Sequence, residues 1–340
     1  MRLGIDLMGG DTPPHVLFEA VLLAAKQLDA SHSLLVIATK SIVNQFSRVS
    51  RLPASKEYTA KIEFRSVAES IAMADEPLRA FRRKKRSSMV VGIGLLKRGR
   101  IDAFVSCGNS GALVGGVTLS LPKLPGTYRA ALLAFLPSAK GAVAVLDVGG
   151  NVACKAHHLV QFAHLGVAFQ RALYDIKIPV VGLLNIGIES GKGTKEVCQA
   201  YAELIRQSQE LQNRGLPPRM LFAGNVEGRD VFNGTVDVLV TDGFSGNVLL
   251  KATEGVASFI LEILQQKFKD DTSEATTATL NQLQKQFNYA EYPGAIICGM
   301  DGIVIKAHGS SSPQAFLSSI LGAADLVNRQ VISLIKEQLL

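Results

Sequence analysis

Glycine paired with an acidic or amide residue recurs at several points of the chain, each directly after an apolar run. The five segments are Asp6–Asp11, Ser106–Gly111, Asp147–Asn151, Gly224–Glu227 and Thr241–Asn247. Glycine lets a ligand approach the backbone, and the N-terminus of a following helix directs N–H groups at an anion. A single loop of this kind would be an ordinary turn. Five of them predict an anion-binding cleft that at least three of the loops line.

A run of basic residues supplies further groups that suit an anion. Arg79, Arg82, Arg83, Lys84, Lys85 and Arg86 lie within eight residues, directly before Ser87 and Ser88. Serine is a typical helix N-cap, and basic residues that lead into a helix N-terminus form a good phosphate site. A solvated basic face, or a patch that binds any polyanion, is the alternative interpretation.

Single side chains in similar loops are further candidates. Lys192 lies between two glycines after an apolar run, so its ammonium either reaches into a cleft or stays on the surface. His308 also follows an apolar run, although a hydrogen-bonded structural histidine is the commoner case. Cys107 lies where a helix N-terminus would lower its thiol pKa, but burial as a small residue is the favoured interpretation.

Composition narrows the class of protein. The chain has 340 residues, of which 47% are hydrophobic and 19% charged, so a disordered protein is excluded. The net charge of +7 favours anionic partners, while the aromatic content of 6% argues against RNA-binding modules that stack bases. No nucleic acid partner is therefore expected.

Cysteine, histidine and hydropathy patterns bear on metal binding, disulfide formation and the cellular compartment of the protein. The four cysteines are far apart without a CxxC motif, and the six histidines show no metal spacing. We therefore expect no metal site, no disulfide scaffold and a reducing cytoplasm. The start of the chain does not read as a signal peptide. The uncharged stretch Ala103–Pro122 is interrupted by glycines, which favours a buried core over a membrane span.

Short apolar runs alternate with longer amphipathic ones along the chain. Strands are predicted at Leu3–Leu7, Ser33–Ala38, Lys61–Ser66, Asp102–Ser106, Ala130–Leu136, Ala142–Val148, Val180–Asn185, Met220–Gly224, Val236–Thr241 and Ile303–Lys306. Helices are predicted at Pro14–Leu28, Ser87–Lys97, Ser110–Leu119, Ala156–Leu173, Thr194–Leu211, Gly246–Gln266, Glu274–Phe287 and Ser312–Glu337. This alternation predicts an α/β protein with a mostly parallel sheet, whose ligands bind at the carboxyl ends of the strands.

One segment, Thr253–Tyr289, departs from this alternation. It reads as two helices joined by the polar turn Lys269–Ser273, with apolar residues at helical spacing in both. The pattern predicts a helical hairpin that projects from the α/β body. A dimerisation arm is the favoured role. Plain core and a membrane or partner contact at the tip, around Lys267, Phe268 and Lys269, are the other interpretations.

The loops, taken in order, resemble a known family. The matching motifs are Met8–Asp11, Asp75–Pro77 with Arg82–Lys85 and Ser87–Met89, Gly108–Ala112, Leu146–Asn151, Gly224–Asp230, Thr241–Val248 and Ile305–Ser311. This series resembles the bacterial phosphate acyltransferases of phospholipid synthesis, the PlsX family. Each motif alone is modest, but the ordered series is specific and extends from Met1 to the final helix.

The resemblance implies a reaction, a fold and partners. Inorganic phosphate would attack the thioester of a long-chain acyl-acyl carrier protein, giving acyl phosphate that a membrane acyltransferase transfers to glycerol 3-phosphate. The implied fold is a single three-layer α/β/α domain over residues 1–340, like that of isocitrate and isopropylmalate dehydrogenases. The implied assembly is a homodimer whose hairpin, residues 253–289, touches the membrane. We expect a cytoplasmic enzyme, peripherally associated with the inner face of the membrane.

Loop position and the resemblance together select the site residues. Lys192, Asn247 and Asp242 are the candidate catalytic residues. The candidate substrate- and phosphate-binding residues are Asp6, Gly9, Gly10, Arg82, Lys85, Ser87, Ser88, Gly108, Asn109, Ser110, Gly111, Asn151, Asn225, Glu227, Gly246 and His308. Phosphate is already an oxyanion nucleophile and a thiolate is a good leaving group. Positioning of the two substrates and stabilisation of the oxyanion would then suffice without a cofactor.

The sequence departs from the family pattern at several positions. Thr12 and Pro13 replace the usual His and Ala before a proline, and Gly150 replaces a frequent Ala. Cys107 stands where the family has Ala, and Cys154 where Asp is common, so neither thiol is expected to be catalytic. Ser110 and Ser245 stand where Thr is frequent. None of these changes removes a charged site residue.

Two other functions stay open at this point. A phosphotransacetylase that uses a short acyl-CoA would share the fold. A nonenzymatic membrane scaffold would use only the hairpin and the basic run, and would not need the glycine–asparagine loops. A decarboxylating dehydrogenase is weaker, because Asp242 has no DxxxD partner for a divalent cation. The acyl-chain preference cannot be predicted from these motifs.

Overall fold

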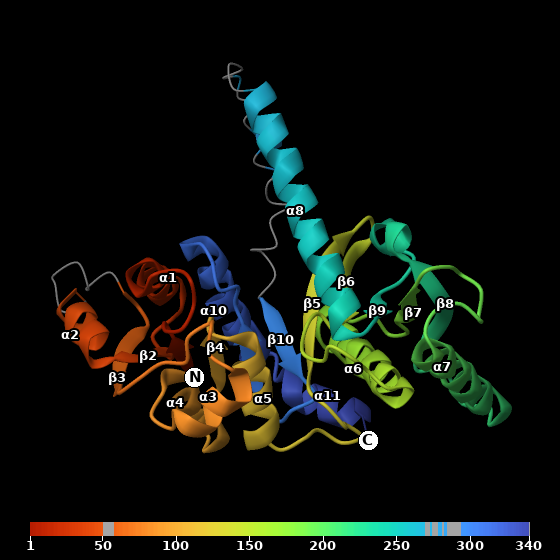
Figure 1. Cartoon of the computed structure of the whole chain (residues 1–340), viewed down its shortest axis with the longest axis horizontal. Helices are drawn as coiled ribbons and strands as arrows, with labels where there is room; N and C mark the ends of the chain where they lie inside the picture. Colours follow the sequence, from red (N-terminus) through yellow and green to blue (C-terminus); the bar gives the residue numbers. More distant parts are fainter. Residues whose placement is uncertain (50–57, 269–272, 274–277, 281, 284–293, 340) are drawn as a thin grey trace. The chain divides into compact units, whose positions relative to one another are not determined.

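The computed structural model describes residues 1–49, 58–268, 273, 278–280, 282–283 and 294–339. The chain forms two compact units (Figure 1). Unit 1 comprises Met1–Leu132 and Tyr292–Leu340, and unit 2 comprises Leu133–Glu291. The prediction of a single domain over residues 1–340 stays a prediction.

Unit 1 is built on a set of strands that are parallel except for one. Its strands, in spatial order, are β3 (Lys61–Val67), β2 (Ser33–Thr39), β1 (Arg2–Asp6), β4 (Ala103–Ser106), β11 (Ile303–Lys306) and β10 (Ala295–Cys298). Only β10 runs antiparallel, to β11. The central strands β1 and β4 are almost entirely buried, as expected for a sheet covered on both faces.

Helices enclose the sheet of unit 1. They are α1 (Pro14–Gln27), α2 (Lys40–Val49), α3 (Pro77–Arg83), α4 (Ser88–Lys97), α5 (Ser110–Ser120), α10 (Pro313–Asn328) and α11 (Val331–Leu339). Helices α1 and α10 pack against each other, and α10 lies on β1, β4 and β11. Helix α4 lies on β1, β2 and β4 and also packs on α5, which in turn packs on α3.

Unit 2 also has a mostly parallel set of strands. Its order is β5 (Ala131–Ser138), β6 (Gly141–Leu146), β9 (Val238–Val240), β7 (Val180–Asn185) and β8 (Leu221–Glu227). Strands β5 and β6 form an antiparallel hairpin, and β6, β9, β7 and β8 are parallel neighbours. The helical elements are α6 (Ala156–Tyr174), α7 (Lys195–Asn213), the 3₁₀ helix η2 (Gly228–Asn233) and α8 (Gly243–Lys267).

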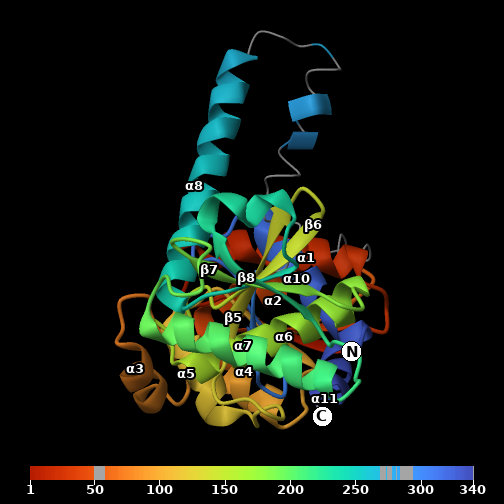
Figure 2. The same cartoon turned by 90° about the vertical axis from the view of Figure 1, so that its right-hand side faces the viewer.

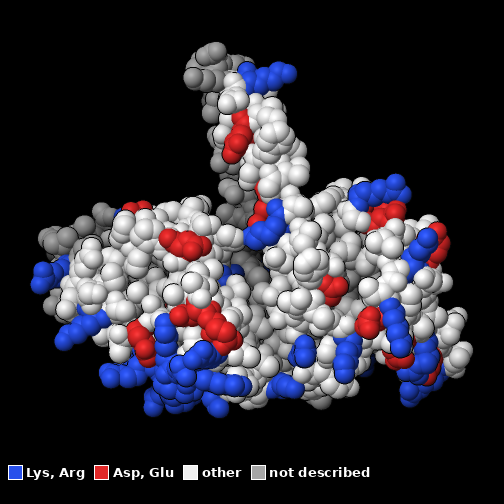
Figure 3. Space-filling model, in the orientation of Figure 1, with Lys and Arg blue, Asp and Glu red and all other residues white. Residues whose placement is uncertain are grey.

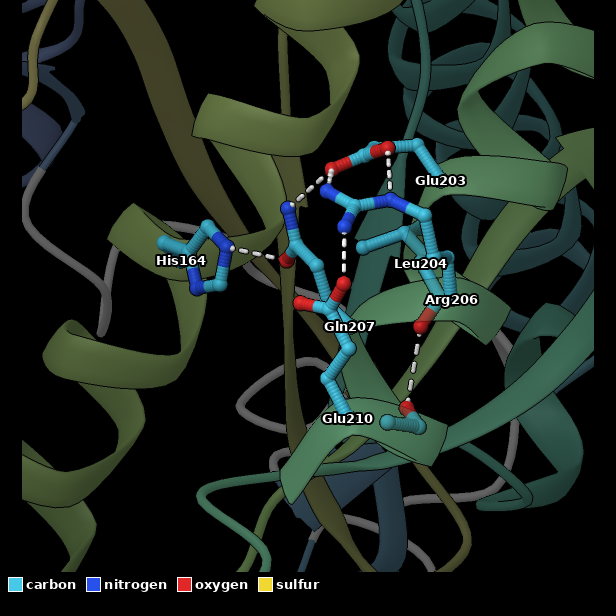
Figure 4. Close-up of polar contacts among 7 residues, drawn as sticks. His164, Glu203, Leu204, Arg206, Gln207 and Glu210 are labelled. Carbon is cyan, nitrogen blue, oxygen red and sulfur yellow. Dashed lines mark hydrogen bonds and ion pairs between the residues drawn. The ribbon is translucent and has the colours of Figure 1, made fainter. Parts of the chain in front are cut away.

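A polar network joins α6 to α7 (Figure 4). The Nε2 atom of His164 lies 3.0 Å from Gln207 Oε1, and Gln207 Nε2 donates to Glu203 at 2.7 Å. Arg206 forms ion pairs with both Glu203 and Glu210. Burial lowers the pKa of His164, which keeps the imidazole neutral and makes Nε2–H the donor to Gln207. The His164–Gln207 contact thus links α6 to α7, and the two helices pack side by side (Figure 2).

Helix α8 leaves the sheet soon after it begins (Figure 1). Of its 25 residues, only Gly243, Gly246 and Ala257 are buried. Its distal half exposes an apolar stripe formed by Val256, Phe259, Ile260 and Ile263. This helix is the first arm of the predicted hairpin. The second arm at Glu274–Phe287, the turn and Lys269 lie largely outside the described residues.

The predicted fold class, a three-layer α/β body with a mostly parallel sheet, is confirmed. All the predicted strands are present, β7 and β11 with the predicted ends and the others with shifted ends, but β10, α2 and α3 were not predicted. The single helix predicted at Ser312–Glu337 is wrong, because Gln330 adopts φ 52° and separates α10 from α11. In the described part of the chain, no helix is long and apolar enough to cross a membrane.

Candidate active site

In unit 2, polar residues end four neighbouring parallel strands. Asp147 follows β6, Asp242 follows β9, Asn185 ends β7 and Asn225 lies near the end of β8. Because these strands are adjacent and parallel, their carboxyl ends meet at one edge of the sheet. Strands are about 4.8 Å apart, so the edge from β6 to β8 spans only about 15 Å. Ligands of α/β proteins bind at such an edge.

Asp147 shapes the loop after β6. Its carboxylate is fully buried and accepts hydrogen bonds from Gly149 N at 3.2 Å and Gly150 N at 2.9 Å. It also accepts one from Asn151 Nδ2 at 2.7 Å. The conformation of the Gly149–Asn151 loop is therefore set by a buried carboxylate beneath it.

The first turn of α8 is docked against this loop. Gly243 N donates to Asn151 O at 2.8 Å, and Asp242 caps the helix by accepting from Ser245 N at 2.8 Å. A Cβ atom on Gly246 would lie 1.9 Å from the carbonyl oxygen of Asp147, so only glycine allows this approach. The helix start places Asn247, which is exposed, beside the loop.

Asn247 and Gly149 are in close proximity. The amide Oδ1 of Asn247 lies 3.5 Å from the position that a Cβ on Gly149 would occupy. Gly149 has φ 132°, a conformation that side chains rarely adopt. The predicted catalytic residues Asp242 and Asn247 and the predicted binding residues Asn151 and Gly246 are thus brought together.

Lys192 lies on the loop after β7, which Asn185 and Asn225 hold in place. Asn185 Nδ2 donates to the carbonyl of Lys192 at 2.9 Å, and Asn225 Nδ2 donates to the carbonyl of Glu189 at 2.8 Å. The Lys192 side chain is exposed, so its ammonium is available at the edge of the sheet. Since β7 is the direct neighbour of β9, Lys192 and Asn247 follow adjacent strands.

Glu227, the last residue of β8, forms an ion pair rather than holding a loop. Its carboxylate pairs with Arg229 at 2.7 Å, and the residue precedes η2. The part of Glu227 in substrate binding stays a prediction.

In unit 1, Asp6 lies beneath three loops. It is 1% exposed and accepts hydrogen bonds from Ser106 Oγ at 2.9 Å and Met8 N at 3.0 Å. The hydroxyl of Ser88, at the start of α4, also donates to it. Burial raises the pKa of Asp6 to about 6, and these donors partly oppose that rise. The carboxylate thus orders the loops from below.

Glycines let the loops of unit 1 pack together. Gly9 has φ 80°, and a Cβ there would lie 2.3 Å from the carbonyl oxygen of Ile71. A Cβ on Gly10 would lie 2.8 Å from Cys107 Sγ and 3.0 Å from Gly309 O, so Gly10 fits between the two following loops. The Gly309 carbonyl also accepts from Asp11 N at 2.8 Å. The loops after β1, β4 and β11 therefore form one packed group.

The loop after β4 leads into α5. Asn109 caps α5 by accepting from Ala112 N at 3.0 Å, and its Nδ2 donates to Met73 O at 3.1 Å and Asp75 O at 3.2 Å. The side chain of Asn109 is thereby committed to the protein. Gly108, Ser110 and Gly111 place the backbone at a helix N-terminus, which is a good environment for an anion.

The basic run divides into buried and exposed parts. Ser87 and Ser88 are buried, and Ser87 caps α4, whereas Arg82 and Lys85 are exposed. Lys84 pairs with Asp75 at 2.6 Å. Lys and Arg side chains gather on the face of unit 1 that carries α3 and α4 (Figure 3). Ser88 thus belongs to the Asp6 group, Ser87 serves as the cap of α4, and the exposed cations form a surface.

His308 and Cys107 have different surroundings within the same group of loops. His308 is exposed, and its Nδ1 accepts from Ser310 N at 3.2 Å. Cys107 is fully buried, and burial raises the pKa of its thiol to about 12. The idea that a helix N-terminus lowers this pKa is wrong, because desolvation dominates. The favoured interpretation of Cys107 as a buried small residue is confirmed.

Most of the predicted loop residues thus lie at strand ends in one unit or the other, whereas Arg82 and Lys85 lie on the surface of unit 1. Sequence reasoning missed Asp147, Asn185 and Lys306 as candidates. Each ends or directly follows an apolar strand, and a polar residue in that place was the available signal. Lys306 is 7% exposed and ends β11.

Replacing Asp6 with Asn is expected to change how stability depends on pH. The folded chain binds the Asp6 proton more tightly than the unfolded chain, whose carboxyl has an ordinary pKa of 3.8. As the pH rises from 4 to 6, the free energy of unfolding of the parent protein should therefore fall by about 3 kcal/mol relative to that of Asp6→Asn. Thermal unfolding at pH 4.5 and 7 measures this, with Asp102→Asn, at an exposed site of the same unit, as control. A Tm difference that is equal at both pH values would contradict it.

In each unit, loops gather at the carboxyl ends of mostly parallel strands, which is where α/β proteins bind ligands. The model of the family "Fatty acid synthesis protein" matches residues 1–334. A phosphate acyltransferase from Brevibacillus brevis is 40% identical over 100% of this chain and 97% of its own length. One from Thermoanaerobacter pseudethanolicus is 38% identical, with 100% and 97% covered. The chain belongs to this family of fatty acid synthesis proteins, and it is an acyltransferase.

Solved structures show the same fold at low sequence identity. A phosphotransacetylase from Streptococcus pyogenes superposes with a TM-score of 0.58 at 16% identity, covering 96% of this chain and 94% of that one. A candidate 4-hydroxythreonine-4-phosphate dehydrogenase from Salmonella typhimurium gives 0.53 at 13% identity, covering 96% and 99%. The dehydrogenase-like fold implied by the family resemblance is confirmed.

Proposed function

We propose that this enzyme transfers a long-chain fatty acyl group from acyl-acyl carrier protein to inorganic phosphate, giving acyl phosphate for phospholipid synthesis. The observation that carries the proposal is the relation to phosphate acyltransferases over the whole chain. The glycine–asparagine loops at the sheet edges agree with it, because the reaction needs held anions more than it needs a nucleophilic side chain.

The chemistry requires no covalent intermediate on the protein. A phosphate oxygen attacks the thioester carbon and forms a C–O bond, giving a tetrahedral oxyanion. The C–S bond then breaks, and the carrier thiolate leaves and takes up a proton from water. The buried, protonated thiol of Cys107 is unsuited to act as nucleophile in such a step.

The unit 2 edge can stabilise the oxyanion. The Lys192 ammonium supplies positive charge, and the Asn247 amide supplies a hydrogen-bond donor from the neighbouring strand end. Asp242 sets the position of Asn247 by capping the first turn of α8. Preorganised donors of this kind lower the activation free energy because they stabilise the negative charge that develops in the transition state.

Incubation with phosphate and palmitoyl-acyl carrier protein tests the proposal. Free carrier thiol should appear in proportion to acyl phosphate, and only when phosphate is present. Acetyl-CoA in place of the carrier substrate tests the short-chain phosphotransacetylase alternative. Absence of thiol release with both donors would favour a nonenzymatic scaffold and sink the proposal.

The acidic carrier protein is proposed to dock on the exposed basic residues of unit 1. Arg82→Glu combined with Arg83→Glu should raise the KM for acyl-carrier substrate, because the attraction becomes repulsion. The effect should shrink as salt is added. Both side chains are exposed at the end of α3, whereas Lys84 holds Asp75 and is left intact.

A matched pair controls for the change of charge. Lys177→Glu combined with Arg214→Glu alters the net charge equally on exposed positions of unit 2. This control should leave the KM near the parent value. Equal KM values for both double variants at every ionic strength would refute docking on α3.

The distal half of α8 is proposed to mediate assembly and membrane contact. Its apolar stripe recurs at helical spacing, and pairing with a second copy in a homodimer would bury it.

Phe268 and Lys267 at the end of the helix suit an anionic lipid surface, where the acyl phosphate would be passed to glycerol-3-phosphate acyltransferase. The proposed location is the inner face of the membrane. Light scattering that gives the mass of one chain would exclude the dimer.

Phe268→Glu is expected to weaken flotation of the protein with anionic vesicles. The change replaces an apolar side chain with a negative charge on the surface proposed to meet the bilayer. Both the apolar and the electrostatic attraction to anionic lipid should therefore become weaker. Phe244→Glu is the control, since Phe244 is also exposed on α8 but at its first turn. Identical flotation of both variants, or none by the parent protein with any lipid mixture, would refute membrane contact through this end.

A further inference from the structure

Lys306 occupies a defined place in unit 1 that the mechanism above does not use. The strand register pairs Asp6 with Ser106 across β1 and β4, and Ser106 with Lys306 across β4 and β11. The three residues therefore form one row across three parallel strands, at the point where each strand ends. Their loops are those that pack together around Gly10.

The Lys306 side chain is buried beneath these loops. It is 7% exposed, and its ammonium donates to the carbonyl of Ala307 and, at 3.5 Å, to that of Cys107. A buried ammonium is costly unless it is hydrogen-bonded. Here the bonds reach the first residues of two different loops, after β4 and after β11.

Each carbonyl lies next to a loop residue proposed to bind phosphate. Cys107 directly precedes Gly108, and Ala307 directly precedes His308. The loop after β1 is hydrogen-bonded to the loop after β11, because Asp11 N donates to Gly309 O at 2.8 Å. The ammonium thus sets the spacing of the β4 and β11 loops, while Asp6 and Ser106 set that of the β1 and β4 loops.

We propose that Lys306 is a positioning residue for phosphate: it holds the loops after β4 and β11 so that their backbone groups bind the anion. This inference rests on the proposed function, in which phosphate is the acyl acceptor. The ammonium also places a positive charge below the loops, which favours an anion above them.

Lys306→Met removes the charge and the N–H donors while keeping most of the length of the side chain. The KM for phosphate should rise about tenfold, as expected for the loss of one or two hydrogen bonds that order a site, with a smaller change in kcat. Lys306→Gln retains an amide donor without charge and should raise this KM less. The KM for acyl-carrier substrate should stay near the parent value in both.

Lys123→Met is the matched control. The Lys123 ammonium also donates to a backbone carbonyl of unit 1, that of Tyr128 at 2.9 Å, but it is exposed. Its loss should leave the KM for phosphate unchanged. The rise in Tm that added phosphate causes gives a second readout that needs no acyl transfer, and it should be smaller in Lys306→Met than in Lys123→Met.

Several outcomes would overturn the proposal. A KM for phosphate within twofold of the parent value in Lys306→Met, with an unchanged phosphate effect on Tm, removes the positioning role. If Lys306→Met does not fold, Lys306→Gln decides by the same two measurements. A parent protein without acyl transfer to phosphate refutes the proposed function instead, and the Tm readout then still tests whether Lys306 orders an anion site.

Discussion

Lys192→Ala and Asn247→Ala should each lower kcat/KM about 100- to 1,000-fold, the cost typical of losing one oxyanion donor. The two residues follow the adjacent strands β7 and β9. Each contributes a cation or an amide donor to the same edge of the sheet, so each loss should act on the transition state. The expected result is a fall in kcat with little change in the KM for either substrate.

Exposed residues of the same type on α7 provide controls for this result. Lys195→Ala removes an exposed lysine at the start of α7, and Asn213→Ala removes an exposed asparagine at its end. Both should keep parent kinetics. Near-normal turnover by folded Lys192→Ala and Asn247→Ala would show that the assignment is wrong.

Gly246→Ala should both destabilise the protein and lower its activity more than tenfold. The added Cβ would meet the Asp147 carbonyl oxygen at 1.9 Å, and a backbone atom cannot move away cheaply. Overpacking of this kind typically costs about 1–3 kcal/mol. The first turn of α8 must shift, and Asn247 shifts with it, so activity should fall further than stability alone explains.

Gly255→Ala on the same helix separates this clash from a general effect of alanine. Nothing lies within 4 Å of a Cβ at Gly255, which is in the exposed part of α8. Alanine there should stabilise the helix by up to about 1 kcal/mol. Thermal unfolding and acyl transfer of the two variants should therefore diverge, and parallel behaviour would contradict close docking of α8.

Much of the fold was predictable because apolar runs mark buried strands. The unpredicted β10 is a run of only four residues, Ala295–Cys298, which pairs antiparallel with β11 outside the βαβ pattern. Helix α3 was hidden in the basic run. Glu76 caps it and Phe81 packs onto Gly116 of α5, but its sequence reads as a solvated charged surface.

The candidate site was predictable at its loops rather than in what supports them. Strand ends followed by glycine identify where a ligand can approach the backbone. Asp147 and Lys306 order those loops from below, and that role depends on which carbonyl or N–H group lies within reach. Such contacts arise from the register between strands distant in sequence, so a local pattern cannot reveal them.

Helix α8 has a mechanical property that follows from its two ends. Its first turn carries Asn247 and is pressed against the Asp147 loop through Gly246, while its last turns expose apolar side chains. The 25 residues of the helix make a stiff rod about 37 Å long. The helix is docked against the rest of unit 2 mainly through its first turn. The turn that carries Asn247 and the distal apolar turns therefore belong to one continuous helix, so a force applied to the distal turns would be transmitted toward Asn247.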